Sequence, residues 1–384
     1  MMAAMPFRLP DLGPDKRRLL GSGLLAFGLV GMALSLYGPA FSALQGRFDI
    51  GAQAVGLIVS LHFLGGFVAV VTIGPVIARL GYRRPLASAA ALAAVGSAGV
   101  ALGPGWELVL LGAFLLGLGL GFLDIGLNLL LVRSFDEGVA PVLNLLHALF
   151  GLGAVLGPAL MAAFIPRFGP PFALVSFASL ALVPLALGLT EPPRPEPASG
   201  RLTAAWGRMV AFVLLFFLYV AVEVGVGSWE TEHLAPAFGP VRAAAFTSLF
   251  WAALTVGRLV AVPVSAWLQP RHLMLGAAGL SLVALALAQS LALAPYAYAL
   301  VGFALAPVFP TGLVWLKEVF PGRVELLTPV VLAIASLAPV LTAPLIGMVV
   351  EARSSAAIPT VLMVLALLLL LLTLGLWSRT RSVA

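Results

Sequence analysis

The sequence ELVLLGAFLLGLGLGFLDIGLNLLLV, residues 107–132, is the clearest indication of the fold. After its first residue, the run holds one ionisable side chain, Asp124, among apolar residues. A transmembrane helix needs about 20 predominantly apolar residues to cross a hydrocarbon core about 30 Å thick. The strands of a membrane β-barrel would instead be short and alternate in polarity. The run therefore predicts a transmembrane helix.

The composition of the whole chain supports the same interpretation. The chain has 384 residues, of which 61% are hydrophobic and 9% are charged, whereas an average soluble domain is about 45–50% apolar and about 25% charged. Its 21 basic and 15 acidic side chains are too few to cover a water-soluble globule of this size. Soluble enzymes, nucleic-acid-binding proteins and disordered scaffolds are excluded, and we expect an integral protein of a lipid bilayer.

The polar composition argues against metal, cofactor and nucleic-acid chemistry. Cysteine is absent and four histidines are spread along the chain, so we expect no disulfide, thiolate centre or metal site. The basic residues are scattered rather than gathered on one face, so the net charge of +6 does not indicate a nucleic-acid partner. No phosphate-binding loop of the Walker type is present, so we expect neither ATP drive nor another cofactor.

Long apolar runs recur along the chain. Cutting the sequence at charged residues, at Pro/Gly clusters and at polar turns gives twelve such runs, and they predict an all-α membrane protein with twelve transmembrane helices. The runs lie near residues 19–45, 53–78, 85–103, 107–132, 140–165, 171–190, 208–232, 243–268, 272–292, 295–319, 325–350 and 357–378.

Basic residues are divided unevenly between the two sides of the membrane. If the N-terminus is cytoplasmic, sixteen of the 21 basic residues fall on the cytoplasmic side and Arg258 falls inside a run. The four on the opposite side are Arg47, Arg167, Arg242 and Arg353. Because cytoplasmic loops are enriched in Lys and Arg, we expect a multi-pass protein of the cell (inner) membrane with both termini in the cytoplasm.

One interruption, EPPRPEPASG at residues 191–200, is rich in proline and charge. Such a segment is a semi-stiff, solvated connector, and it separates two halves of six runs each. We expect an N-terminal bundle (residues 1–190), a cytoplasmic linker (residues 191–207) and a C-terminal bundle (residues 208–384). Pro141-Val142 recurs as Pro329-Val330, consistent with an internal duplication. Duplicated six-helix halves indicate a transporter that rocks around a central site.

Polar residues in the fourth and fifth runs form the first candidate site. Asp124 and Asn128 lie four residues apart, on one helical face, and Asn144 and His147 lie three apart on the next helix. The turn between the runs is short, so we expect an antiparallel hairpin with Asp124 level with His147. These residue types suit coupled binding of a proton and a polyhydroxylated solute. Alternatively, Asn144 and His147 only join two helices through hydrogen bonds.

The seventh, eighth and tenth runs supply further candidates. Ionisable residues inside a membrane are functional candidates by default, which singles out Glu223 and Arg258. Glu223 could bind a proton or the substrate, or could pair with Arg258, either structurally or as a contact broken during gating. Trp229 and Trp315 could stack on a sugar ring, although tryptophan also marks membrane interfaces. Pro307 predicts a kink in the tenth run, ahead of Trp315.

Residues 74–84, GPVIARLGYRR, resemble the loop between the second and third helices of the major facilitator superfamily. The resemblance covers essentially all twelve runs and implies the major facilitator fold, with two pseudo-symmetric six-helix bundles. The usual acid of this loop is replaced by Ala78, whereas the glycine and basic positions remain. Arg79 is one of these basic positions, and we expect it to serve in gating or in a structural ion pair.

Within the superfamily, FLDIGLN at residues 122–128 and LNLLH at residues 143–147 resemble the fucose–proton and glucose/galactose symporter family. The resemblance implies that Asp124 takes part in protonation and sugar recognition. It also implies that Asn144 and His147 belong to the substrate site, where we expect Asn128 as well.

The same family is similar at a second stretch and differs at one position. The stretch from Tyr219 through Glu223 to Trp229 is similar to bacterial relatives, which implies that Tyr219 and Trp229 bind substrate. Those symporters carry a second acid in the first helix, near the position where this chain has Ser35. Proton coupling would then rest on Asp124, assisted by Glu223.

The function predicted from the sequence is transport, not enzymatic catalysis. We expect a monomeric, alternating-access secondary active transporter that imports a sugar or a similar polyol with a proton. Three alternatives stay open: a proton-coupled exporter of hydrophobic or cationic compounds that uses Glu223, an uncoupled facilitator, and a lipid scramblase or sensor on the same fold.

Overall fold

The computed structural model describes residues 13–135, 139–192 and 206–380. Most of the predicted linker and residues 136–138 of the turn between the fourth and fifth runs lie outside the described residues. Within these ranges every element is a helix: α1 (Pro14–Phe48), α2 (Ala52–Leu80), α3 (Arg83–Leu102), α4 (Trp106–Ser134), α5 (Val139–Phe164), α6 (Gly169–Leu187), α7 (Trp206–Phe238), α8 (Pro240–Ser265), α9 (Pro270–Leu287), α10 (Ala294–Leu305), α11 (Val308–Val319), α12 (Val324–Ala335), α13 (Ala338–Ala352), the 3-10 turn η1 (Ser355–Ala357) and α14 (Ile358–Thr380).

Twelve helical segments of the described chain are long and apolar enough to cross a membrane, which confirms the predicted number of spans. The tenth span, Ala294–Val319, consists of α10 and α11, and the eleventh, Leu326–Ala352, contains most of α12 and all of α13. The break between α10 and α11 falls at Pro307, so the predicted kink is confirmed. A proline ring removes a helical hydrogen bond and clashes with the preceding turn.

Helix α7 is longer than the run that predicted it. It continues to Phe238, whereas the apolar run ends near residue 232. Glu230 therefore lies about two turns before the end of the helix, inside the fold rather than at its rim. Glu223 was the one acid expected inside this span, and the structure adds Glu230.

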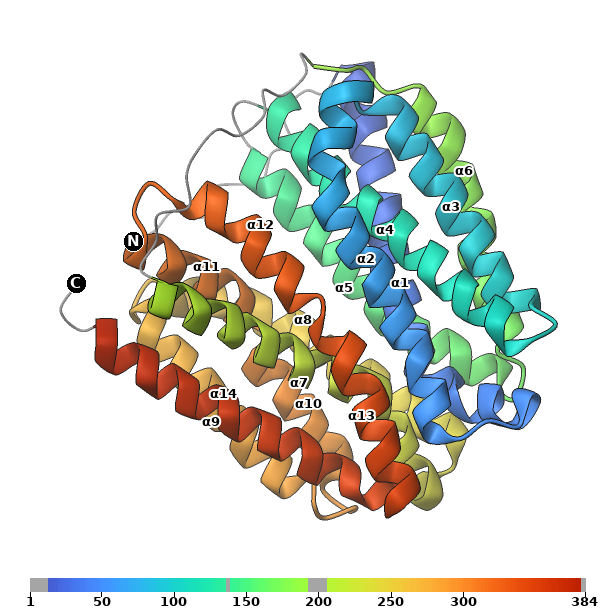
Figure 1. Cartoon of the computed structure of the whole chain (residues 1–384), viewed down its shortest axis with the longest axis vertical. Helices are drawn as coiled ribbons and strands as arrows, with labels where there is room; N and C mark the ends of the chain where they lie inside the picture. Colours follow the sequence, from blue (N-terminus) through green and yellow to red (C-terminus); the bar gives the residue numbers. More distant parts are fainter. Residues whose placement is uncertain (1–12, 136–138, 193–205, 381–384) are drawn as a thin grey trace.

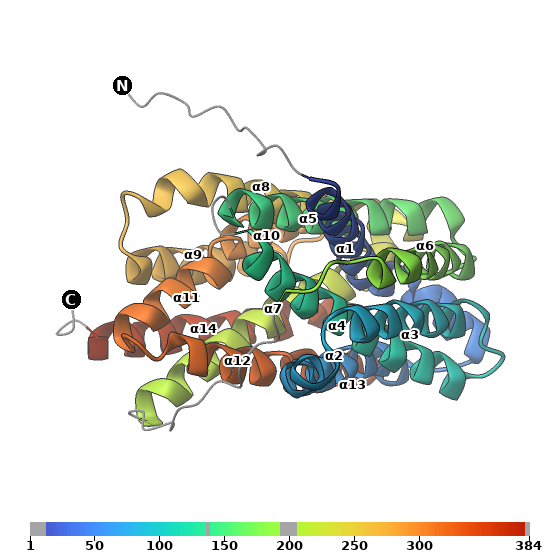
Figure 2. The same cartoon turned by 90° about the horizontal axis from the view of Figure 1, so that it is seen from above.

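The spans form two bundles that lie side by side (Figures 1 and 2). In the N-terminal bundle, α4 packs against α2 and α3, and α1 packs against α5. In the C-terminal bundle, α8 packs against α7 and α10, and α14 against α7 and α9. The two bundles meet where α1 contacts α7, α2 contacts α13 and α5 contacts α8.

Close backbone contacts join the bundles at one end, which we call the closed end. It is the end where α13 lies beside α2 in Figure 1. A Cβ atom on Gly38 of α1 would lie 2.7 Å from the carbonyl oxygen of Gly227 of α7, and one on Gly56 of α2 would lie 2.8 Å from that of Ala343 of α13. Only glycine allows such an approach.

Polar contacts reinforce the closed end. The Ser60 hydroxyl of α2 donates to the Val340 carbonyl of α13 over 2.9 Å. The backbone N–H of Gln53, in the first turn of α2, donates to the Glu351 carboxylate of α13 over 2.8 Å. We call the other end of the molecule, where α1 begins and α14 ends, the termini end; toward it the ribbons of the two bundles diverge (Figure 1).

Candidate functional site

Asp124 and Asn128 form a hydrogen-bonded pair on α4. The Asn128 side-chain amide donates to the Asp124 carboxylate over 3.1 Å, and both side chains are half-buried. Their four-residue spacing places them on one helical face. The carboxyl group is thus held by an amide donor while it keeps partial exposure.

Asn144 and His147 project from α5 and are both exposed. The His147 ring meets the Phe27 ring of α1 edge-on, with 5.6 Å between the centroids. Among the described residues, no hydrogen bond links this pair to Asp124 or Asn128.

The prediction that α4 and α5 pack together as a hairpin was wrong. Helices α4 and α5 contact each other only slightly, because α4 packs on α2 and α3 and α5 packs on α1 and α8. A short turn made the two helices antiparallel but did not make them packing partners.

Helix α1 shows how deep Asp124 lies. A Cβ atom on Gly23 of α1 would lie 3.4 Å from Leu131 of α4 and 3.3 Å from Leu146 of α5. Asp124 lies seven residues from Leu131, about 10 Å deeper along its helix. That depth is near Gly31 of α1, eight residues beyond Gly23. Asp124 is therefore between about one and two helical turns deeper than His147, not level with it as expected.

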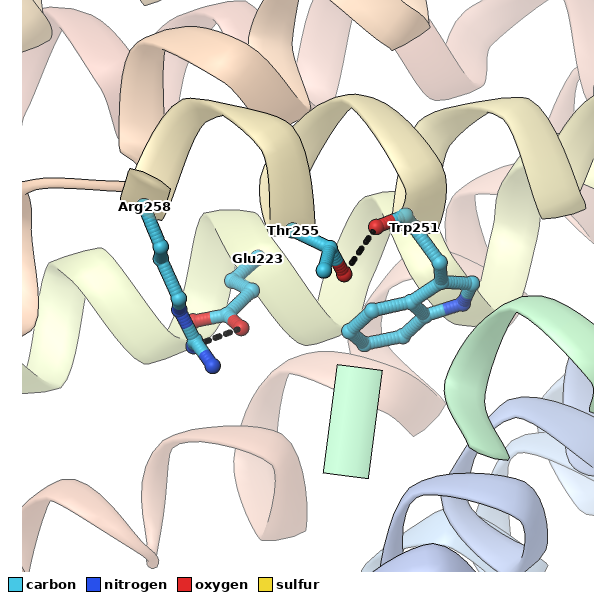
Figure 3. Close-up of polar contacts among 4 residues, drawn as sticks. All are labelled: Glu223, Trp251, Thr255 and Arg258. Carbon is cyan, nitrogen blue, oxygen red and sulfur yellow. Dashed lines mark hydrogen bonds and ion pairs between the residues drawn. The ribbon is translucent and has the colours of Figure 1, made fainter. Parts of the chain in front are cut away.

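Glu223 of α7 and Arg258 of α8 form an ion pair at the bundle interface (Figure 3). The Arg258 Nη2 and Glu223 Oε1 atoms are 3.8 Å apart, too far for a hydrogen bond. The Arg258 guanidinium also lies 5.8 Å from the centre of the Phe150 ring of α5, in the other bundle. Tyr219, one turn earlier on α7, lies beside both charged groups and is buried.

The ion pair and Asp124 lie at similar depth on opposite sides of the interface. A Cβ atom on Gly31 would contact the Phe150 backbone, and the Phe150 ring faces Arg258. Because Asp124 is level with Gly31, all of these groups lie near the level where α5 meets α8. Asp124 of one bundle and the ion pair of the other thus lie at a similar level of the fold.

Asn144 and His147 lie beyond that level, toward the termini end. They share a helical face with Gly151, where an added Cβ would contact the Thr255 side chain of α8. Helix α5 therefore contacts α8 at Gly151. Asn144 and His147 lie one to two turns from Gly151 toward the termini end and are exposed. These donors and acceptors are therefore available to a solute that enters from the termini end.

The predicted aromatic residues occupy different surroundings. Trp229 is fully buried at the closed end, where its ring contacts the Phe41 ring of α1 with 4.9 Å between the centroids. Trp315 is 2% exposed and packs edge-on against Phe212 inside the C-terminal bundle. It borders a cavity of about 330 Å³ that Gln269 and other residues line at the termini end. In this conformation both indole rings are buried against other aromatic rings.

Among the described residues, Ser35 of the first span and Arg79 of the second make no hydrogen bond or ion pair with Asp124, Glu223 or Arg258. Arg79 is exposed near the end of α2 and makes no ion pair within the described part of the chain. Ser35 is fully buried, and its hydroxyl donates to the Met32 carbonyl. A Cβ on Gly157 of α5 would collide with the Ser35 hydroxyl, so α1 and α5 approach each other closely here.

The structure also adds a residue that the sequence analysis missed. Glu230 is 0% exposed, yet its hydropathic context, GSWETEH, reads as the polar end of a span. Its spacing of seven residues from Glu223 was the available signal, because that spacing repeats on one helical face. Among the described residues, no cluster of His, Asp and Glu could hold a metal ion.

Comparison with sequence families identifies one match. The family model described as Major Facilitator Superfamily matches residues 23–241. The sodium-dependent glucose transporter 1 of Xenopus laevis is 26% identical over 335 residues, which cover 75% of this chain and 67% of that protein. The glucose/mannose transporter GlcP of Bacillus subtilis is 24% identical over 347 residues, covering 85% of this chain and 86% of that protein.

Solved structures with the same fold cover nearly the whole chain. A D-xylose-proton symporter superposes with a TM-score of 0.79 at 16% identity, over 94% of this chain and 97% of that one. The nucleoside transporter NupG superposes with a TM-score of 0.77 at 14% identity, over 96% of this chain and 100% of that one. At these identities the likeness shows the arrangement of the helices alone.

Proposed function

The chain belongs to the Major Facilitator Superfamily, and from this premise we propose that it takes up a sugar or a similar polyhydroxylated solute together with a proton. It is a multi-pass membrane transporter rather than an enzyme. We place both termini in the cytoplasm, as the distribution of basic residues predicts, so this conformation faces inward. We expect the transporter to act as a monomer.

One observation carries the proposal: Asp124 is a half-buried acid at the level where the bundles meet. Ionisable residues inside a membrane mark ion and substrate pathways by default. A proton needs only one carboxylate oxygen, and Asn128 holds that carboxylate in place. Exposed Asn144 and His147 supply the donors and acceptors that solute hydroxyls require.

The geometry suggests how binding moves the bundles. Asp124 lies in the N-terminal bundle, and the Glu223–Arg258 pair lies in the C-terminal bundle at similar depth. A solute that bonds to both sides favours the conformation in which they approach. Protonation of Asp124 neutralises a carboxylate that would otherwise be enclosed in the membrane interior without a cation when the bundles move. A proton moving down the membrane potential supplies about 2.3 kcal/mol per 100 mV.

The names of the similar proteins support a sugar as the solute, but they differ in the coupling ion that they name. Two name glucose, one of them as sodium-dependent, and a third names a D-xylose–proton symporter. Reconstituted protein should therefore be tested with an inward pH gradient and, separately, with an inward sodium gradient. We expect accumulation of labelled hexose with the pH gradient. Accumulation with sodium alone would overturn the proton as the coupling ion.

The variant Asp124→Asn tests the coupling residue. It keeps the size and the Asn128 contact but has no titrating group. We expect it to exchange labelled for unlabelled solute while losing accumulation against a gradient. Glu107→Gln, an exposed acid in the first turn of α4, is the matched control and should accumulate normally. Uphill accumulation by Asp124→Asn would show that Asp124 is not the coupling group.

A ligand screen tests the solute class. A ligand that binds only the folded protein stabilises it by about 2.7 kcal/mol at 100 times its dissociation constant. We expect hexoses to raise the melting temperature and lipophilic cations to leave it unchanged. The reverse result would favour an exporter that uses Glu223. Lipid movement without solute flux would favour a scramblase.

A further inference from the structure

Glu230 is the most deeply buried acid among the described residues. Its side chain is 0% exposed, and neither carboxylate oxygen has a hydrogen-bond partner in the described chain. It lies on α7 about 10 Å beyond Glu223 toward the closed end. It is therefore separate from the central site.

Polar groups lie around this carboxylate but are engaged with one another. The Thr247 hydroxyl of α8 lies beside it and is hydrogen-bonded to the Thr231 hydroxyl over 2.8 Å. Tyr298 of α10 also lies close, and its hydroxyl is hydrogen-bonded to Nδ1 of His233 over 2.9 Å. Glu230 thus lies beside polar groups but has no described cation to pair with its negative charge.

No described cation on a neighbouring helix compensates Glu230. Arg258 pairs with Glu223, and half-buried Glu232 adds a further acid on α7 itself. In the closed-end half, the helices packed against α7 carry six other ionisable groups: Tyr37 and Arg47 on α1, Arg242 on α8, Tyr296 and Tyr298 on α10, and Glu351 on α13. Of these six, Tyr37 is bonded to His62, Tyr298 to His233, and the rest are exposed.

An ionised carboxylate buried without a partner costs several kcal/mol, and such a group neutralises instead. We propose that Glu230 is a proton-binding site of the C-terminal bundle, occupied while the closed end is shut. The proton comes from water and forms an O–H bond on one carboxylate oxygen. The neutral acid then has a donor to direct at Thr247.

The location of Glu230 connects its proton to the closed end. The neighbouring Trp229 packs on Phe41 of α1, and the backbone of Gly227 and Ser228 lies against Gly38. When the bundles part here, water reaches this turn of α7 and Glu230 releases its proton to it; closure requires a proton again. This coupling role, unlike the proton occupancy, rests on the proposed function.

Infrared difference spectroscopy of the purified protein tests occupancy without any substrate. A protonated carboxyl group has a C=O band distinct from that of a carboxylate. We expect the wild-type protein to show such a band at neutral pH, Glu230→Gln to lose it, and the neighbouring control Glu232→Gln to keep it. If Glu230→Gln does not fold, Glu230→Asp should shift the band. A wild-type spectrum whose band neither variant alters overturns the proposal.

Transport separates this inference from the proposed function. We expect Glu230→Gln, which mimics the neutral acid, to exchange solute but to lose accumulation driven by a pH gradient, whereas Glu232→Gln accumulates normally. Full accumulation by Glu230→Gln overturns the coupling role. If no sugar is transported by the wild-type protein, the proposed function fails, and the infrared result still decides whether Glu230 holds a proton.

Discussion

The closed end and the termini end of the bundle interface are built from different chemistry. At the closed end, backbone meets backbone at Gly38 and Gly56, and the aromatic pair Phe41–Trp229 packs between the bundles. Toward the termini end, the interface offers exposed Asn144 and His147 instead. The glycine and aromatic contacts exclude water from the closed end, whereas the exposed Asn144 and His147 side chains need water or a solute as hydrogen-bond partners.

This difference shows which end controls the conformation. Packed interiors are bistable rather than continuously deformable, so the glycine contacts are either made or lost as a unit. Wet polar groups can exchange water for solute at little cost. Changes at the closed end should therefore shift the conformational equilibrium, whereas changes toward the termini end should alter solute affinity.

The largest effect is expected from Gly56→Leu. An added Cβ would already lie 2.8 Å from the Ala343 carbonyl oxygen, so the side chain prevents closure. Overpacking costs about 1–3 kcal/mol or more, which corresponds to roughly tenfold or larger loss of the closed state. Transport should fall accordingly, and the closed end should separate.

Spin-label distances measure that separation directly. The chain has no cysteine, so labels can be introduced at Gly46 and Ser354, which are exposed near the closed end in different bundles. The matched control is Gly276→Leu on α9, where an added Cβ meets nothing within 4 Å. An unchanged distance in Gly56→Leu would contradict the role assigned to this contact.

A smaller effect is expected from the ion pair between the two ends. Arg258→Gln leaves Glu223, 11% exposed, without its partner. Fully buried pairs lose about 3–5 kcal/mol on such a change; because the Arg258 side chain is 27% exposed, we expect about 2 kcal/mol. Thermal unfolding in detergent measures this loss.

The double variant Glu223→Gln/Arg258→Gln separates structure from gating. It removes both charges, so stability should recover. Transport should stay impaired, because Arg258 also contacts Phe150 of the other bundle. A double variant that transports at the wild-type rate would make the pair purely structural.

The sequence predicted the twelve spans because each span is a continuous apolar run, and that signal is local. It also located Asp124, Asn128, Glu223 and Arg258, since polar residues are rare in such runs. It missed Glu230 because this acid stands two residues before the end of the predicted run, where a charged residue indicates the rim of a span. Helix α7 instead continues to Phe238 and packs against α8 and α10.

Packing partners were the second thing that the sequence could not supply. Equal depth for Asp124 and His147 assumed that helices joined by a short turn also pack together. The partners of α5 are instead α1 and α8, and α8 lies in the other half of the chain. Contacts between distant segments depend on the shapes of whole helix faces, and two-residue spacings carry no information about them.

Removing the exposed polar groups should have a moderate effect on affinity. A hydrogen bond contributes about 0.5–1.5 kcal/mol, so His147→Ala or Asn144→Ala should raise the KM for the solute by roughly 2- to 10-fold. Both side chains are exposed, so stability should not change. Uptake kinetics and thermal unfolding measured together test this. A fall in stability at constant KM would show that these residues only join helices.

The smallest effect is expected at the polar contact of the closed end. The Glu351 carboxylate accepts the Gln53 N–H at the start of α2, in the other bundle, where an anion also interacts favourably with the helix dipole. Such an interaction contributes about 0.3–1 kcal/mol, so Glu351→Gln should reduce the closed population by roughly two- to fivefold.

The matched control is Glu107→Gln. Glu107 lies in the first turn of α4 and stabilises the N-terminus of that same helix, so its loss should leave the Gly46–Ser354 spin-label distance unchanged. Because Glu351 reaches across the interface and Glu107 does not, equal distances in the two variants would show that glycine packing alone holds the closed end. A shift confined to Glu351→Gln would show that a charge between the bundles adds to that packing.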